Sequence, residues 1–472
     1  KKYLIFFIMI RYLISIKKKE KLYQVILEAC NKHINRSHNN IITYPFTSNR
    51  NISIYFIWFF FKRLISMSLF DMNKVINLKY KNFNIGVYAA SNTFTNHKVF
   101  FNKFTMHLDL IKNLLIVAKK VDYSLSLVKV SKGIYVDHVG YISGVNIQVF
   151  AKNKKIVYCN GYPRGLCFVD YSKKKNFKLS PFDILKIRKK SKKKKIKQKE
   201  IENKYKKILK NPKANLKWMK FTSYDNLSKK KILAVDLKKF DYLIYAHSFV
   251  DGQLFYGFDG FVNLLDWLEF SIRQLKRLNK RVLIKPHPNF YNKMFGKVAE
   301  QDRKIFLKLK RKYEDESTVF IDIPIENYEI LKRVNKNIVL ISHHGTAILE
   351  GTFLGFKTIC SQSTIWSKEF KISNQWNNIQ SYKKILIKKP QQLRNFKNSK
   401  DFYEISSQLF FNDYGHGGNK NFISIIEKFT KKIDWKKIIS KPNLIYDQIK
   451  NQNDHKKIVN KISQNIEEII CL

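Results

Sequence analysis

The sequence predicts an α/β protein whose second half is a parallel, doubly wound sheet. From residue 242 onward, short runs rich in β-branched residues alternate with segments of helical periodicity, and the connections between them are short. This alternation is typical of a parallel sheet with helices on both faces. The chain has 472 residues, of which 44% are hydrophobic, so it is long enough for two domains and too apolar for wholesale disorder.

The elements of the second half follow one another closely. The expected strands are 242–246, 282–284, 319–322, 338–341 and 358–360. The expected helices are 261–278, 299–312, 327–333 and 346–354. The helix at 261–278 is the clearest, because its apolar residues share one face and its charged residues lie away from that face.

The first half is less regular. We expect a strand near 84–90, a helix over 104–120, and further strands within 130–150 and at 155–158. Toward the C-terminus, 422–429 and 458–470 have helical patterns. The predicted division is an N-terminal extension (1–80), a first α/β domain (81–185), a basic linker (186–230), a second α/β domain (231–400) and a helical C-terminal segment (401–472).

The net charge of +54 is carried mostly by lysine. A charge of this size is typical of proteins that bind nucleic acid or an anionic membrane. The abundant Ile, Asn, Phe and Tyr that accompany it are what a strongly AT-biased genome produces, and no recognisable nucleic-acid module is present. We therefore expect no nucleic-acid partner and a mild attraction to membrane surfaces.

Two segments suit an anionic membrane surface. The first is the lysine-rich run 186–210, and the second is the aromatic run 52–61, which Lys62 and Arg63 follow. The alternatives are a solvated linker for the first and a buried core segment for the second. No stretch of ~18 uncharged apolar residues predicts a spanning helix. The five cysteines lack Cys-x-x-Cys spacing, which indicates a reduced, cytoplasmic compartment and, with the two basic segments, peripheral attachment at the inner face of the plasma membrane.

Two of the predicted strands end in turns rich in groups that bind anions. Lys285 and His287 follow the strand at 282–284, and two prolines stiffen their turn. Ligands of open α/β sheets sit beyond the carboxyl ends of strands, so these side chains are candidates for donor binding. A neutral or a protonated imidazole can donate a hydrogen bond to a phosphate oxygen. The alternative is an ordinary structural turn.

The second turn comprises Ser342, His343, His344, Gly345 and Thr346. Gly345 permits close approach of the backbone, and Thr346 is expected to cap the helix that begins there, with free N–H groups facing a phosphate. The donor-binding candidates here are Ser342, His343, Gly345 and Thr346. The adjacent histidines raise the question of a metal, but neighbouring side chains at a strand end are expected to diverge, so we predict no metal and no cofactor.

Glu350 lies one helical turn after Thr346, on the same face of the predicted helix. A carboxylate there would reach ribose hydroxyls when the phosphates lie at the helix start. The alternative is an ordinary capped helix with a solvated acid.

Further candidates lie at the ends of other predicted strands. His247 and Asp251 are the catalytic candidates, as a general base for an acceptor hydroxyl or as contacts for a leaving diphosphate. An aspartate just before glycine is also a common turn former. In the first domain, Asp137 and Tyr141 are acceptor-side candidates.

From about residue 242 to 366 the chain resembles the bacterial capsular and surface polysaccharide biosynthesis proteins, the group that contains Kdo-transferring capsule enzymes. The resemblance is carried by residues 247–251, 261–268, 285–288 and 342–350, followed by Gly355. It implies a GT-B arrangement, in which two Rossmann-like domains face a cleft and the second holds the sugar nucleotide. It also implies the cytosolic face of the inner membrane and transfer without a metal. His343 and His344 stand where small residues are commoner in the family.

By position, His287 matches the His-Pro phosphate contact of that family, and Ser342, Thr346 and Glu350 match its second phosphate-and-ribose loop. The resemblance therefore implies a glycosyltransferase that uses a nucleotide-sugar donor, CMP- or UDP-linked, and a glycan or lipid-linked acceptor. Four alternatives stay open. Two are enzymes of the same fold, a CDP-glycerol-type glycerophosphotransferase and a non-hydrolysing sugar-nucleotide epimerase. The others are a non-catalytic GT-B-like protein that binds a polysaccharide or lipid carrier, and a basic scaffold at the membrane surface.

Overall fold

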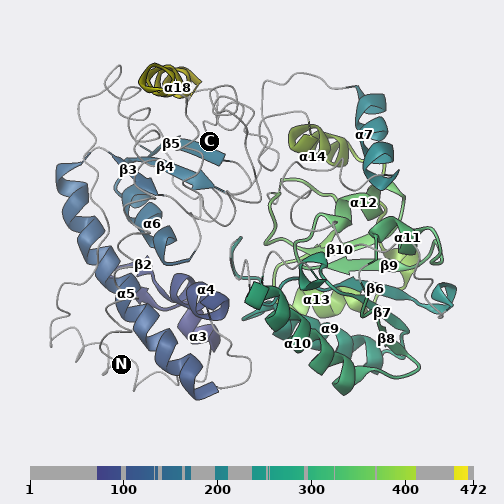
Figure 1. The fold of residues 1–472 in the computed structure, drawn as a ribbon. Coiled ribbons are helices and arrows are strands. Elements are labelled where there is room, and N and C mark those ends of the chain that lie inside the picture. Colours follow the sequence, from purple (N-terminus) through teal and green to yellow (C-terminus); the bar gives the residue numbers. More distant parts are fainter. Residues whose placement is uncertain are drawn as a thin grey trace.

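The structure, a computed structural model, describes residues 72–96, 103–131, 133–136, 141–161, 165–171, 197–210, 236–250, 254, 256–291, 296–323, 325–366, 369–410 and 451–465. These residues form two units that each combine helices with a sheet, and the units lie beside one another in Figure 1. The predicted α/β class is confirmed. The aromatic run 52–61 lies outside the described residues.

The second unit is built on a six-stranded sheet in which every pair of neighbours is parallel. In chain order its strands are β6 (Tyr242–Tyr245), β7 (Val282–Lys285), β8 (Thr318–Phe320), β9 (Val339–Ser342), β10 (Lys357–Ser361) and β11 (Asn374–Trp376). The spatial order is β11-β10-β9-β6-β7-β8. Numbered along the chain, this is the 3-2-1-4-5-6 order of a dinucleotide-binding Rossmann sheet, and its order reverses between β6 and β9.

Alternate residues of each central strand face opposite sides of the sheet, and both sides are covered. Tyr242 and Ile244 of β6 belong to one buried cluster together with residues of α9 (Leu264–Arg277), α10 (Gly296–Tyr313) and α13 (Ile379–Leu386). Leu243 and Tyr245 belong to another, which includes α11 (Asn327–Leu331) and meets α12 (Ala347–Phe353). Burial on both faces explains why these strands are continuously apolar.

The boundaries of the helices follow their caps. α9 begins three residues later than predicted. The Asn263 side chain accepts a hydrogen bond from the Asp266 N–H at 2.8 Å, and this N-cap sets the start of the helix. β11 and α13 were not predicted. Asn378 and Ser381 form a reciprocal capping box at the start of α13, which the residue types at those positions could have indicated.

The first unit differs more from the prediction. Its elements are α3 (Met72–Ile76), β1 (Lys79–Tyr80), β2 (Phe83–Asn84), α4 (Gly86–Asn96), α5 (Lys103–Val130), β3 (Gly133–Val136), η2 (Tyr141–Ser143), α6 (Gly144–Lys152), β4 (Ile156–Gly161) and β5 (Gly165–Asp170). The strand β4 pairs parallel with β3 and antiparallel with β5, so this small sheet is mixed.

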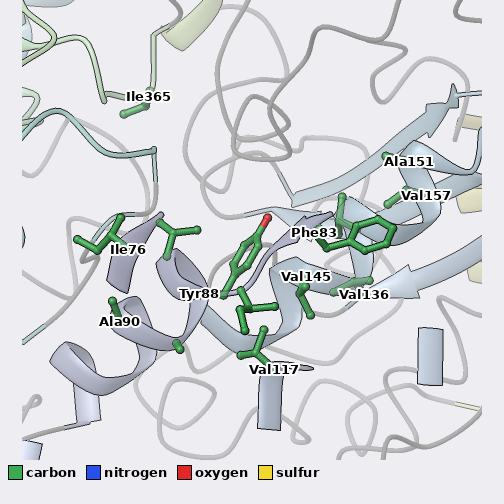
Figure 2. Close-up of a cluster of buried hydrophobic side chains, with 14 of the residues drawn as sticks. Ile76, Phe83, Tyr88, Ala90, Val117, Val136, Val145, Ala151, Val157 and Ile365 are labelled. Carbon is green, nitrogen blue, oxygen red and sulfur yellow. The ribbon is translucent and has the colours of Figure 1, made fainter. Parts of the chain in front are cut away.

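Two predicted strands are helices. The segment predicted as a strand at 84–90 is largely α4, and most of the second half of 130–150 is α6. Both helices are buried on nearly all sides, as Figure 2 shows for Tyr88 and Val145, so their sequences carry no amphipathic period that separates a helix from a strand. Gly86 begins α4 where a Cβ would lie 1.7 Å from the Val75 carbonyl oxygen.

The buried cluster of the first unit continues into the second. It contains Ile76 and Tyr88 from the first unit and Ile365 from the second, all labelled in Figure 2. The two units therefore share apolar contacts.

The part of the predicted basic linker that the structure describes is largely a helix. α7 (Gln198–Lys210) buries its apolar side against the second unit, with the Tyr205 ring stacked 4.7 Å from Phe353 and 5.4 Å from Phe402 of α14 (Lys400–Phe410). The last described helix, α18 (Gln452–Asn465), is drawn on the side of the first unit in Figure 1. The predicted helix at 422–429 lies outside the described residues. No helix of the described part is long and apolar enough to cross a membrane.

Candidate active site

Histidine side chains from neighbouring strands meet where the strand order reverses. His247 follows β6, His287 follows β7, and His344 follows β9. The His247 ring centroid lies 3.9 Å from that of His344 and 5.1 Å from that of His287. The structure therefore brings the turns after three strands together at the switch point, which is where open α/β sheets bind ligands.

Hydrogen bonding defines which nitrogen of His287 carries a proton. The Asn289 N–H donates to His287 Nδ1 at 3.2 Å, so this nitrogen is an acceptor and a neutral ring holds its proton on Nε2. Burial lowers the pKa of His287 well below 6.5, and the nearby His247 and Lys285 lower it further. The ring is partly exposed, and it presents an N–H donor to the site.

Lys285 is a buried cation at the same edge of the sheet, with 5% of its surface exposed. Burial lowers its pKa to about 8, although the charge of Glu350 opposes that shift. Among the residues that the structure describes, no carboxylate lies within ion-pair distance of the ammonium. A buried charge without a direct partner is costly, and such an arrangement is commoner at ligand sites than in structural cores.

Glu350 faces this cation from α12. It is 9% exposed, and burial raises the pKa of its carboxyl, while a hydrogen bond from Asn327 and the charge of Lys285 act in the opposite direction. The Asn327 amide donates to Glu350 Oε2 at 2.7 Å. The predicted alternative of a solvated acid is therefore wrong. Contact with a ribose stays a prediction.

The turn after β9 is held by Ser342 rather than by Thr346. The Gly345 N–H donates to Ser342 Oγ at 3.2 Å, and a Cβ at position 345 would lie 2.7 Å from that oxygen, so a larger residue there would displace the Ser342 hydroxyl. Thr346 occupies the N-cap position of α12 with φ −65° and ψ −14°, and its side chain makes no capping hydrogen bond. The predicted cap is wrong, because Thr346 already has helical backbone angles and a capping side chain needs an extended residue.

His343 and His344 do not diverge as predicted. Their Nδ1 atoms lie 2.8 Å apart, because both residues follow the strand in a bend instead of continuing its alternation. His343 Nε2 lies 2.9 Å from Asp259 Oδ2, and the edges of Trp267 and Trp376 enclose the ring. In the described residues, no group of three or more His, Cys, Asp or Glu side chains is arranged to hold a metal ion.

Two buried aspartates support the site, and neither was predicted. Asp259 is 2% exposed and contacts His343. Asp302 of α10 is 0% exposed and accepts hydrogen bonds from Ser248 Oγ at 2.5 Å and from the Phe249 N–H at 2.7 Å, which fixes the turn that carries His247. Asp302 lies among charged residues of an amphipathic helix, so its pattern indicates a solvated position.

The structure describes one of the three remaining candidates. Asp251 and Asp137 lie outside the described residues. Tyr141 begins η2 in the first unit with φ +53°, a conformation that is uncommon for a residue with a side chain. Its acceptor-side role stays a prediction.

We expect His344→Gln to make the protein less sensitive to acid. Burial, followed by the neighbouring His247, His343 and His287, lowers the pKa of His344 well below 6.5, so the unfolded state binds the proton more tightly and stability falls as the pH drops. A histidine that stays neutral in the folded protein lowers the free energy of unfolding by about 1.4 kcal/mol as the pH falls from about 7.5 to 5.5. Urea unfolding of both proteins at both pH values measures the difference. Equal pH dependence would show that His344 titrates normally.

No protein-family model matches the chain, and no curated protein matches it either. Among solved structures, the chain is similar to the KpsC protein of Thermosulfurimonas dismutans, a beta Kdo 2,4 transferase, with 9% identity, a TM-score of 0.29, and coverage of 58% of this chain and 78% of that one. It is also similar to the UDP-GlcNAc 2-epimerase of Methanocaldococcus jannaschii, with 13% identity, a TM-score of 0.26, and coverage of 63% and 80%. Both likenesses concern the α/β architecture alone.

Proposed function

We propose that this chain is a glycosyltransferase that moves a sugar from a nucleotide-sugar donor to a surface-polysaccharide precursor. The observation that carries the proposal is the buried Lys285 ammonium at the switch point of a Rossmann-ordered sheet, close enough to His287 to lower its pKa, with the His287 ring beside that of His247 and the His247 ring beside that of His344. A cation and N–H donors gathered in a poorly solvated place suit the phosphates of a nucleotide. Residues 242–366 resemble capsule enzymes, and this resemblance supports a nucleotide that carries a sugar.

In this proposal, Lys285 and His287 bind the donor phosphates. As the glycosidic bond breaks, negative charge develops on the leaving phosphate, and preorganised donors in a low-dielectric site stabilise it more than water would. His287 Nε2–H is held in the donating tautomer by the Asn289 N–H on the other ring nitrogen. Loss of these groups would therefore slow transfer as well as weaken binding.

Glu350 and Asn327 form the neighbouring polar pair, at 2.7 Å, and they are suited to a sugar or ribose hydroxyl. A buried carboxylate that accepts one hydrogen bond retains capacity to accept others. The first unit is proposed to supply the acceptor side. Peripheral attachment to the cytoplasmic face of the membrane through the basic and aromatic segments remains part of the same proposal.

Thermal unfolding with a panel of CMP-, UDP-, GDP- and CDP-linked donors tests the proposal. A sugar-linked donor at 100 times its dissociation constant should stabilise the protein by about 2.7 kcal/mol. His287→Ala should lose about 1.5–3 kcal/mol of donor binding free energy, measured by calorimetry. Stabilisation by CDP-glycerol alone would favour a glycerophosphotransferase, and no stabilisation by any nucleotide would favour the polysaccharide-binding alternative.

A further inference from the structure

We propose that Asp259, His343 and His344 form a proton relay, in which Asp259 and His343 are positioning residues and His344 Nε2 is the base. The relay itself is independent of any substrate. Its use, which is to take the proton of an acceptor hydroxyl during glycosyl transfer, rests on the function proposed above.

The first group of the relay is the Asp259 carboxylate, and hydrogen-bond donors around it favour its ionised form. Asp259 Oδ2 accepts a hydrogen bond from the Ser361 hydroxyl and lies 2.9 Å from His343 Nε2, and Asp259 Oδ1 accepts the Phe261 N–H at 3.4 Å. The Ser361 Oγ accepts the Ser363 N–H at 2.9 Å, so its own proton points to Asp259. Burial alone would raise the pKa of Asp259, but the charge and hydrogen bond of His343 and these other donors outweigh it, and the pKa is lowered.

A carboxylate at this position determines the tautomer of both histidines. Because Asp259 is an acceptor, His343 must carry a proton on Nε2, and a neutral His343 then has a bare Nδ1. His343 Nδ1 lies 2.8 Å from His344 Nδ1, so His344 must donate across this contact. A neutral His344 with its proton on Nδ1 has an unprotonated Nε2, which is the tautomer required of a base.

The relay explains how His344 can accept a proton although a positive charge on its ring is disfavoured. His344 faces His247 from β6 and His287 from β7, with His343 on its own turn and the Tyr256 ring 5.6 Å away. Lys285 lies beside His287. A proton that arrives at His344 Nε2 releases the Nδ1 proton to His343, and the positive charge then resides on His343 beside Asp259.

The bonds balance in the proposed transfer step. The acceptor oxygen forms a bond to the anomeric carbon, the bond from that carbon to the donor phosphate breaks, and its electron pair leaves with the phosphate. The acceptor proton goes to His344 Nε2, and the His344 Nδ1 proton goes to His343 Nδ1. Asp259 stays ionised throughout and stabilises the imidazolium, as the aspartate does in serine-protease triads.

The test is nitrogen NMR of the full chain labelled at histidine, with His343→Gln and His344→Gln used to assign the signals. In the wild-type protein at neutral pH we expect His343 protonated on Nε2 only and His344 protonated on Nδ1 only. When the pair takes up a proton, His344 should change to the Nε2–H tautomer while its ring remains neutral. A neutral His344 with its proton on Nε2 at neutral pH would overturn the proposal.

Asp259→Asn supplies the second arm. An amide can donate to His343 Nε2, so both histidines should change tautomer together. Asp241→Asn is the matched control, because Asp241 accepts the Arg281 N–H at 2.9 Å before the start of β6, at the other end of the sheet, and an asparagine oxygen can do the same. Unchanged tautomers in a folded Asp259→Asn protein would contradict the relay.

Activity measurements distinguish a failure of the relay from a failure of the proposed function. With a donor that the protein uses, Asp259→Asn should lower kcat about 100-fold or more while donor affinity is retained, because general-base assistance contributes that much. Loss of donor affinity with unchanged kcat would contradict the role of His344 as base. If no donor is used, the proposed transfer fails, while the tautomers still decide whether the relay exists.

Discussion

Lys285→Met is expected to weaken donor binding by about 1.5–3 kcal/mol, or roughly 10- to 150-fold in affinity, the range for hydrogen bonds to charged groups. The same substitution should leave the unliganded protein as stable as the wild type or more so. Lys285 is 5% exposed, and burial disfavours its charged form, so removing the charge relieves a cost that methionine of similar length does not carry. Opposite signs for binding and stability distinguish a ligand-binding residue from a structural one.

Calorimetry with the donor and urea unfolding without it measure the two quantities. Lys276→Met is the matched control, since Lys276 pairs with Asp315 away from the switch point and should leave donor affinity unchanged. A large loss of stability in Lys285→Met without a change in affinity would show that Lys285 is structural.

The pH dependence of Lys285 adds a second check on the same residue. Its pKa in the folded protein, about 8, lies below its ordinary value of 10.5. Between these values the unfolded state binds more protons, so stability rises with pH across this interval, and Lys285→Met should lose that rise. Donor affinity of the wild type should fall above about pH 8, because the neutral amine no longer attracts phosphate.

Asp302→Ala is expected to lower the free energy of unfolding by about 3–5 kcal/mol, because two buried donors each lose a hydrogen bond to a charged acceptor that contributes about 1.5–3 kcal/mol. The substitution leaves Ser248 Oγ and the Phe249 N–H without the carboxylate that now accepts both of them. The turn after β6 should then loosen and move His247, so donor affinity should also fall.

Asp302→Asn separates the two roles of this carboxylate. An asparagine oxygen still accepts one of the two hydrogen bonds, so the loss of stability should be smaller than for alanine. Glu300→Ala on the same helix removes an exposed carboxylate that pairs with Lys304 and should leave stability nearly unchanged. Equal effects of Asp302→Ala and Glu300→Ala in urea unfolding would show that the buried hydrogen bonds of Asp302 contribute nothing to stability.

The sequence predicted the second unit well because its signals are local. The strands β6, β7 and β9 are short β-branched runs buried on both faces, and the amphipathic stripe of α9 is visible without any tertiary information. The predicted boundaries of these strands differ from the observed ones by one residue. Where strands and helices alternate in this way, the parallel sheet and the edge that holds its ligand follow from chain direction.

The first unit could not be predicted in the same way. α4 and α6 are surrounded by other elements, so polar residues such as Ser91 and Gln148 are buried along with the apolar ones, and no polar face marks a helical period. Whether such a run becomes a helix or a strand depends on what packs around it. α7 likewise packs against α12 and α14 through long-range contacts. The lysines on its exposed side do not indicate which elements it contacts.

For the site, the sequence by itself determined which side chains lie at the strand ends: Lys285 and Ser342 are the last residues of β7 and β9, and His287, His343 and His344 follow these strands. Only the tertiary structure decided which groups support them. Asp259 reaches His343 across 84 positions of the chain, and Asp302 reaches Ser248 across 54. No local pattern encodes such a pairing, because a buried aspartate and a solvated one have the same neighbours in sequence and differ only in what the fold brings against them.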